Sequence, residues 1–219
     1  MFNLTKYQVV KAKCLEKSAQ LVAVSKTRSV EELKELYSSG ARAFGENRVQ
    51  ELLEKRKHLA QDIEWHLIGH LQSNKVKYIA DFIHLIHSVD SIRLLVEIQK
   101  EAKKNDRVIA VLLQVHLAQE ESKFGIKENE LEDFMQNLLK LDLSHVQIQG
   151  MMTMASFTDD KEQIRSEFKK GKQLFTRIRT KYFAMDSAFN ILSMGMSGDY
   201  EIALEEGSTM IRVGSLLFD

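Results

Sequence analysis

Residues 21–44, which read LVAVSKTRSVEELKELYSSGARAF, predict a strand, a helix and a second strand in that order. The apolar, β-rich residues 21–25 and 42–44 predict the two strands. Between them, Ser29 and Glu32 have the spacing of a helix-capping box, and Gly40 stands where a helix end favours a left-handed residue. A strand, a helix and a strand in succession are typical of a parallel sheet.

The same alternation of strands and amphipathic helices continues to the C-terminus. A (β/α)8 TIM barrel takes about 250 residues and tolerates roughly 200, so eight such units nearly use up the 219 residues. We therefore predict the α/β class, with a single barrel domain over residues 1–219 and a leading helix at about residues 5–19. The remaining strands are predicted at residues 64–68, 85–88, 108–115, 147–151, 190–193 and 209–213.

The composition argues against several other classes of protein. Lys plus Arg number 31 and Asp plus Glu number 31, so no net charge attracts the chain to nucleic acid or to an anionic membrane. Apolar runs such as residues 108–113 fall far short of the roughly 20 residues that cross a bilayer. Residues 1–20 lack a signal-peptide core, and Cys14 is the only cysteine. We expect a cytoplasmic protein, either a monomer or a weak dimer.

Lys26 is the first candidate for chemistry. It ends the first predicted strand, and the alternation places it on the same side as Val22 and Val24, so that its stem starts from a buried surface. A desolvated lysine is partly neutral, and a neutral amine attacks an aldehyde to form a Schiff base. The alternative is a solvated lysine on the barrel rim. Barrels collect their chemistry at the C-terminal ends of strands, but a lysine there is more often solvated, so the Schiff-base reading needs a second feature.

The segments that follow the last two predicted strands predict a phosphate site. Barrels often bind phosphate there, because glycines let the backbone approach closely and helix N-terminal N–H groups and serine hydroxyls donate to the oxygens. The alternative is that these glycines only serve turns. Arg212 lies in the last strand, where a buried guanidinium needs a carboxylate or a polar ligand atom. The segments contain Ser193, Gly195, Ser197 and Gly198 before a helix near Asp199, and Gly214 and Ser215.

A zinc hydrolase is an alternative that begins from histidine spacing. His66 and His70 are four residues apart, and His84 and His87 follow. Two such histidines share a face only on a helix, whereas WHLIGH at residues 65–70 reads as a strand that enters a turn. We predict no metal site.

Seven ordered motifs, spread over almost the whole chain, resemble the pyridoxal phosphate homeostasis proteins. Long motifs in a fixed order agree by chance much less often than one short fingerprint. The motifs are AVSKTR at residues 23–28, GENRVQE at 45–51, HLIGHLQSNK at 66–75, SKFG at 122–125, GMMTM at 150–154, LSMGMSGD at 192–199 and GSTMIRVGSLLF at 207–218.

The resemblance implies a barrel like the N-terminal domain of alanine racemases, a fold-type III pyridoxal 5′-phosphate (PLP) protein. It implies that PLP is held as an internal aldimine on Lys26, that Arg212 faces the pyridine nitrogen, and that Asn47 lies near the cofactor. Because a guanidinium stays protonated, it cannot give the ring a full proton. The phosphate would be surrounded by Ser193, Ser197, Gly214 and Ser215.

The resemblance also implies a carrier or regulator of intracellular PLP without complete catalytic machinery, with apo-PLP enzymes as recipients. The alternative is a PLP-dependent racemase or decarboxylase, which needs a second acid/base such as Tyr200 or His66. Lys123 is a candidate for transient cofactor attachment. Asp219 stands where relatives usually have glycine and a basic tail, and this difference predicts altered cofactor release.

Overall fold

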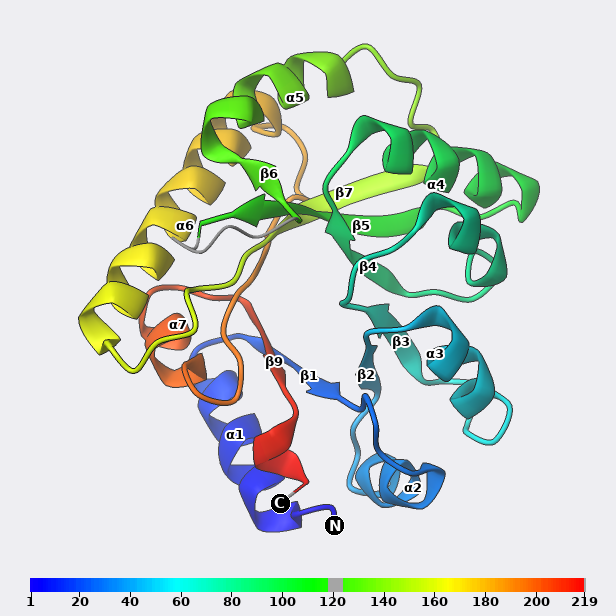
Figure 1. The fold of residues 1–219 in the computed structure, drawn as a ribbon, viewed down its shortest axis with the longest axis vertical. Coiled ribbons are helices and arrows are strands. Elements are labelled where there is room, and N and C mark those ends of the chain that lie inside the picture. Colours follow the sequence, from blue (N-terminus) through cyan, green and yellow to red (C-terminus); the bar gives the residue numbers. More distant parts are fainter. Residues whose placement is uncertain (118–123, 219) are drawn as a thin grey trace.

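The computed structural model describes residues 1–117 and 124–218, and within them eight parallel strands form a closed barrel surrounded by helices (Figure 1). The barrel strands are β1 (Gln20–Val24), β2 (Ala43–Glu46), β3 (Glu64–Leu67), β4 (Leu85–Val89), β5 (Ile109–His116), β7 (Val146–Met152), β8 (Ile191–Ser193) and β9 (Met210–Val213). The ring closes because β1 pairs with both β2 and β9, while β4 pairs with β5. The predicted fold class is confirmed.

The eight predicted strands agree with the observed ones to within two residues at each end. A further short strand, β6 (Ile126–Lys127), pairs with the end of β5 and was not predicted. The helices that surround the barrel are α1 (Leu4–Glu16), α2 (Val30–Ser38), α3 (Val49–Arg56), α4 (Ile92–Lys104), α5 (Leu131–Leu138), α6 (Lys161–Tyr182) and α7 (Tyr200–Glu205), with 3₁₀ turns η1 (Ser73–Tyr78), η2 (Glu128–Glu130) and η3 (Ser215–Leu217).

Helix α2 begins and ends where its sequence signals predict. The Ser29 hydroxyl accepts a hydrogen bond from the Glu32 N–H, and the Glu32 carboxylate accepts one from the Ser29 N–H. Gly40 has a φ of 91°. The leading helix α1, in contrast, ends at Glu16 and not at residue 19, because Ser18 adopts a left-handed conformation with a φ of 52°.

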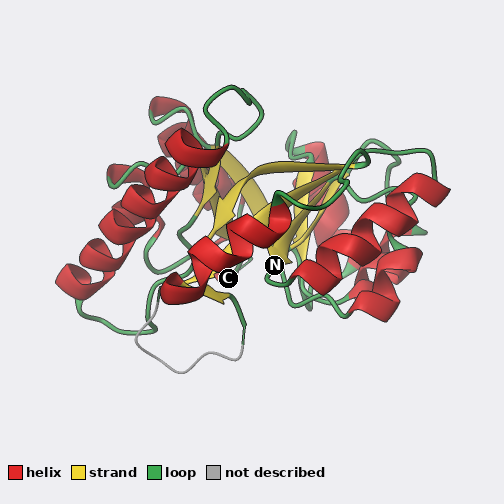
Figure 2. Cartoon of the chain, turned by 90° about the horizontal axis from the view of Figure 1, so that it is seen from above, coloured by secondary structure: helices red, strands yellow, loops and turns green. Residues whose placement is uncertain are grey.

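Two apolar layers stabilise the barrel. One fills its interior with side chains from six different strands: Val22, Ala43, Leu85, Leu112, Met152 and Met210. The other lies between the strands and the helices and includes Phe44, Trp65 and Phe168. Figure 2 shows the strands at the centre with helices on both sides. Polar side chains that follow the inner layer along the strands therefore lie inside the barrel, toward its C-terminal end.

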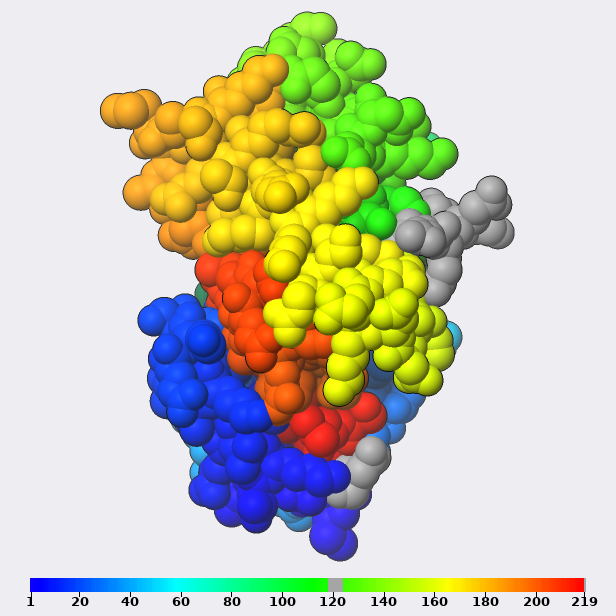
Figure 3. Space-filling model, turned by 90° about the vertical axis from the view of Figure 1, so that its left-hand side faces the viewer, coloured from blue at the N-terminus to red at the C-terminus, as the bar shows by residue number. Residues whose placement is uncertain are grey.

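The two ends of the described chain lie side by side. The Asn3 N–H donates to the Leu217 carbonyl over 2.8 Å, which joins α1 to η3. On the face drawn in Figure 3, α1 in blue lies against the orange and red C-terminal segments. This contact and the pairing of β1 with β9 support the prediction of a single domain over residues 1–219. None of the helices in the described ranges is long and apolar enough to cross a membrane.

Candidate functional site

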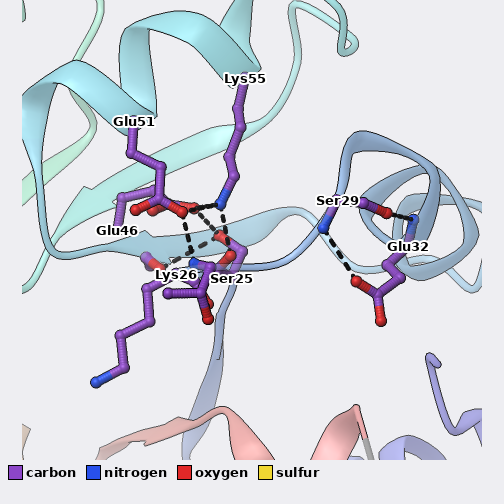
Figure 4. A network of polar contacts seen from close by, with 9 residues as sticks. Ser25, Lys26, Ser29, Glu32, Glu46, Glu51 and Lys55 are labelled. Atoms are coloured by element: carbon purple, nitrogen blue, oxygen red, sulfur yellow. Dashed lines mark hydrogen bonds and ion pairs between the residues drawn. The ribbon is translucent and has the colours of Figure 1, made fainter.

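Lys26 lies directly beyond β1, at the C-terminal end of the barrel. Val22 and Val24 are buried as predicted, but the Lys26 side chain is exposed. The prediction that its stem is buried is therefore wrong, because β1 ends at Val24 and the chain leaves the barrel wall before Lys26. Figure 4 shows the amine extending away from the neighbouring polar cluster. The amine is thus accessible to a ligand from solvent.

A buried polar cluster holds the backbone on both sides of Lys26. The Lys55 ammonium of α3 donates to the Ser25 carbonyl over 2.6 Å and to Glu46 Oε1 over 2.8 Å. The Ser25 hydroxyl donates to the same Glu46 oxygen over 2.5 Å. On the other side of Lys26, the Thr27 N–H donates to Glu51, which also pairs with Lys55 (Figure 4). We call Ser25, Glu46, Glu51 and Lys55 the Lys26 clamp.

The Lys26 clamp is costly to bury and so depends on its internal contacts. Glu46 is fully buried, and one of its carboxylate oxygens, Oε2, has no hydrogen-bond partner in the described chain. Burial raises the pKa of the Glu46 carboxyl, against the effect of Lys55 and Ser25. Sequence reasoning missed this cluster, although Glu51 and Lys55 have the i, i+4 spacing of a helical ion pair.

We expect Lys55→Met to destabilise the fold by about 3 kcal/mol. Removing one partner from a buried ion pair costs about 3–5 kcal/mol, and the low end applies because Glu46 can take up a proton. Urea unfolding measures the change. The matched control is Lys57→Met, since Lys57 pairs with Glu54 at the exposed surface of the same segment. Equal effects of the two substitutions would contradict a structural role for the Lys26 clamp.

Arg212 begins a buried chain of polar side chains inside the barrel. Its guanidinium donates to the Ser193 hydroxyl over 2.6 Å and to the Thr153 carbonyl over 3.1 Å. Ser193 Oγ lies 3.2 Å from His87 Nδ1, and His87 Nε2 lies 2.9 Å from His66 Nδ1. This row of hydrogen-bonded side chains therefore runs from β9 through β8 and β4 to β3.

Burial lowers the pKa values of the ionisable side chains in this hydrogen-bonded row and so sets their charges. It lowers the pKa of Arg212 to about 10, so the guanidinium remains protonated near neutral pH. It lowers the pKa of His66 to about 3 and that of His87 well below its usual value, so both imidazoles are neutral. No carboxylate of the described residues forms an ion pair with Arg212. The hydrogen-bond partners of Arg212 are neutral, and the Asp199 carboxylate acts on its charge from beyond ion-pair distance, so a polar ligand atom is favoured as its further partner.

The predicted phosphate residues fall into two places. The Ser197 hydroxyl accepts hydrogen bonds from the N–H of Gly214 over 3.1 Å and of Leu216 over 3.5 Å, so Ser197 and the start of η3 at Ser215 lie together. Ser193 instead contacts Arg212 and His87, fully buried in the barrel. Its assignment to the phosphate stays a prediction, and its contacts favour a role in positioning Arg212.

Gly214 brings this turn against the strand that leads to Lys26. A Cβ added at Gly214 would lie 3.1 Å from the Val24 Cβ and 3.2 Å from the Val24 carbonyl oxygen. Asn47 is half-buried just after β2, and its backbone is so close to Gly69 that a Cβ there would lie 2.4 Å from the Asn47 carbonyl oxygen. Lys26, Arg212 and the Ser197–Gly214 turn thus come from neighbouring strands. Lys123 and Asp219 lie outside the described residues.

The two acid/base candidates of the racemase alternative have other contacts. The Tyr200 hydroxyl lies 3.2 Å from Glu201 Oε1, and Lys13 of α1 lies over its ring. His66 lies within the barrel, in contact with His87. The zinc-hydrolase alternative required a helix through His66 and His70, but His66 lies in strand β3, as predicted.

This fold and this site define a barrel of the alanine racemase N-terminal type. The family model described as alanine racemase, N-terminal domain, matches residues 5–219. An alanine racemase from Clostridium difficile 630 shares the fold at 16% identity and a TM-score of 0.74, over 99% of this chain and 56% of that chain.

More similar proteins narrow the class to one family. The pyridoxal phosphate homeostasis protein of Aquifex aeolicus (strain VF5) is 42% identical over 204 residues, covering 93% of this chain and 87% of its own. PipY of Synechococcus elongatus PCC7942, solved with PLP bound, is 33% identical with a TM-score of 0.88 and 99% coverage of both chains. The chain belongs to the pyridoxal phosphate homeostasis protein family, which confirms the resemblance found in the sequence.

Proposed function

We propose that this protein binds PLP covalently through Lys26 and acts in PLP homeostasis as a carrier or regulator, not as an enzyme. The observation that carries the proposal is the grouping, on neighbouring strands, of an exposed lysine amine, a buried arginine that donates hydrogen bonds to neutral groups, and a serine–glycine turn. The PLP bound to PipY and the names of the family members support it.

The residues present fit the chemical groups of PLP. PLP supplies an aldehyde that condenses with an amine, and a pyridine ring that can take up electron density. Lys26 would provide the amine, and Arg212 would donate a hydrogen bond to the ring nitrogen. The backbone N–H groups and hydroxyls of Ser197, Gly214 and Ser215 would hold the phosphate. Asn47 would lie near the bound cofactor.

An absorption spectrum of the purified protein tests cofactor binding. After addition of PLP and removal of the excess, we expect a visible absorption band that borohydride abolishes, with the reduced adduct on the peptide that contains Lys26. Free PLP at the same concentration, passed through the same desalting step, is the control. A colourless protein that borohydride leaves unmodified would refute the proposal.

The proposal of a carrier rests on what the neighbours of the cofactor site lack. Arg212 keeps its proton near neutral pH, because its pKa is about 10, and so it does not protonate the ring nitrogen. Tyr200 and His66 have the other contacts described above. The chain's own residues would therefore bind and orient PLP, and we propose no second acid/base among the described residues. Recipient enzymes would take the cofactor from the exposed Lys26 end of the barrel.

We expect the PLP-loaded protein to racemise or decarboxylate amino acids no faster than free PLP does. General acid–base catalysis contributes about 10²–10⁴-fold to rates, and that contribution requires a positioned second group. Proton NMR of L-alanine in heavy water measures deuterium uptake at Cα. Chiral chromatography of the same samples measures racemisation. Rapid deuterium uptake accompanied by racemisation would show that the protein is an enzyme.

A further inference from the structure

A cluster of two histidines and a glutamate, side chains of the types that bind metals, lies at the end of the barrel opposite Lys26. Glu64 begins strand β3, His66 follows two residues later, and His84 directly precedes β4. Each offers one ligand atom, and these three atoms lie within 4.8 Å of one another. The pairing of β3 with β4 fixes the arrangement, since the His84 N–H donates to the Trp65 carbonyl over 2.9 Å. The rings of His66 and His84 stack at 5.2 Å.

His66 contributes a second, independent observation. Its side chain is fully buried, and its Nδ1 is taken up by His87. Its other nitrogen, Nε2, is buried and has no hydrogen-bond partner in the described chain. Buried ring nitrogens without a partner are rare and costly. Because Nδ1 is occupied, Nε2 is the atom that His66 can offer to a ligand.

We propose that Glu64, His66 and His84 bind one divalent transition-metal ion of the Zn²⁺ class at the N-terminal end of the barrel. Imidazole nitrogens and carboxylate oxygens bind Zn²⁺ at about 2.0–2.2 Å, which places two donors of a tetrahedral site roughly 3.3 Å apart. Glu64 and His84 are not fully buried, so their side chains can move by the order of 1 Å that this geometry requires. Water would supply the fourth ligand.

The surroundings of His66 match those of a metal-bound histidine. Such a histidine donates its second ring N–H to a fixed acceptor, which sets the tautomer. With the ion on Nε2, His66 Nδ1–H donates to His87 Nε2, and His87 Nδ1–H donates to the Ser193 hydroxyl. Ser193 can accept this bond together with the one from Arg212. The two nitrogen donors disfavour Mg²⁺ and Ca²⁺, which take oxygen ligands.

The site differs from the zinc alternative that the sequence raised. That alternative combined His66 with His70, which follows β3 at the other end of the barrel. The sequence prediction of no metal site rested on rejecting the His66–His70 pair. His84 was part of that alternative only as a histidine farther along the sequence, and Glu64 was not part of it, because only the pairing of β3 with β4 brings His84 beside His66.

Isothermal titration of Zn²⁺ into the full chain tests the site. The protein carries no affinity tag and is dialysed free of excess PLP, because both bind metals. We expect one Zn²⁺ per chain and no saturable heat with Mg²⁺. His84→Ala and Glu64→Gln should each weaken binding by at least about 100-fold, since even outer-shell substitutions cost 10–100-fold. His58→Ala, an exposed histidine in the turn that follows α3 and outside this cluster, should leave it unchanged.

The absorption spectrum of bound Co²⁺ gives a second readout, since a nitrogen- and oxygen-ligated four-coordinate ion has strong visible bands that free Co²⁺ lacks. Far-UV circular dichroism checks that His84→Ala and Glu64→Gln remain folded. If only one of the two variants folds, that variant is sufficient to test the site. The proposal is overturned if the chain binds no Zn²⁺ at a one-to-one ratio. It is equally overturned if both ligand variants bind as tightly as the parent, or if His58→Ala loses binding to the same extent.

Discussion

Replacing Lys26 with alanine should abolish the covalent attachment of PLP and leave the fold intact. The fold should survive because the Lys26 side chain is exposed. The Lys26 clamp holds this turn through Ser25 and Thr27, not through the Lys26 side chain. The free energy of unfolding should therefore change by no more than about 0.5 kcal/mol. The loss of attachment should be complete, because no other group of the proposed site is an amine.

The measurement is borohydride reduction of the PLP-loaded protein, followed by mass spectrometry of its peptides. Lys34→Ala is the matched control, since Lys34 is an exposed lysine on the adjacent helix α2. We expect a reduced adduct in the parent and in Lys34→Ala, and none in Lys26→Ala. An undiminished adduct in Lys26→Ala would show that another lysine holds PLP. An adduct on the peptide that contains Lys123 would identify that residue as the second attachment site predicted from the sequence.

The strands could be predicted because their signal is local. Residues 21–25 form a short apolar run that leads into a polar turn, and β1 follows this pattern within one residue. Helix α1 ends earlier than predicted, since its end is a Schellman turn: the Ala19 N–H donates to the Cys14 carbonyl, with Ser18 in the left-handed position. Glycine normally marks that position, and serine gives no such signal. Strand β6 has two residues and depends on its distant partner β5.

The candidate site likewise contains residues with a local sequence signal and residues that only contacts between distant segments bring together. The positions of Lys26 after the first strand and of Arg212 within the last strand could be predicted from the strand patterns, while their roles toward PLP stay predictions. The Lys26 clamp could not be predicted, since it brings Ser25, which follows β1, and Glu46 of β2 into contact with Lys55 of α3. The contact between Ser193 and Arg212 could not be predicted from the sequence either. Its hydroxyl faces Arg212 because both follow the inner layer of the barrel, and this layer becomes visible only when β8 and β9 are paired.

The protein should bind PLP far more tightly than unphosphorylated pyridoxal. Charge-assisted hydrogen bonds contribute roughly 1.5–3 kcal/mol each. Two such bonds from the turn at Ser197, Gly214 and Ser215 give a preference of about 10²- to 10⁴-fold, at 1.4 kcal/mol for each factor of ten. Equilibrium titration of both ligands, followed by absorbance, measures this ratio. Equal affinities would show that the phosphate is bound elsewhere or not at all.

Substitutions in the turn should change this ratio by different amounts. Ser197→Ala should reduce the preference only about tenfold, because the backbone N–H groups of the turn remain. Gly214→Val should remove most of it, since a Cβ there would lie 3.1 Å from the Val24 Cβ, closer than ordinary van der Waals contact, and would displace the turn that donates to the phosphate. Pyridoxal is the internal control, because damage to the whole site would weaken both ligands alike.

Ser193→Ala separates the two possible roles of Ser193. If its hydroxyl positions Arg212, as its 2.6 Å contact favours, the substitution should weaken PLP and pyridoxal by the same factor and leave their ratio unchanged. If Ser193 binds the phosphate, as the sequence predicted, only the affinity for PLP should fall. Because Arg212 would serve the ring nitrogen that both ligands share, we expect the first result. A selective loss of PLP affinity would place Ser193 with Ser197 and Gly214 at the phosphate.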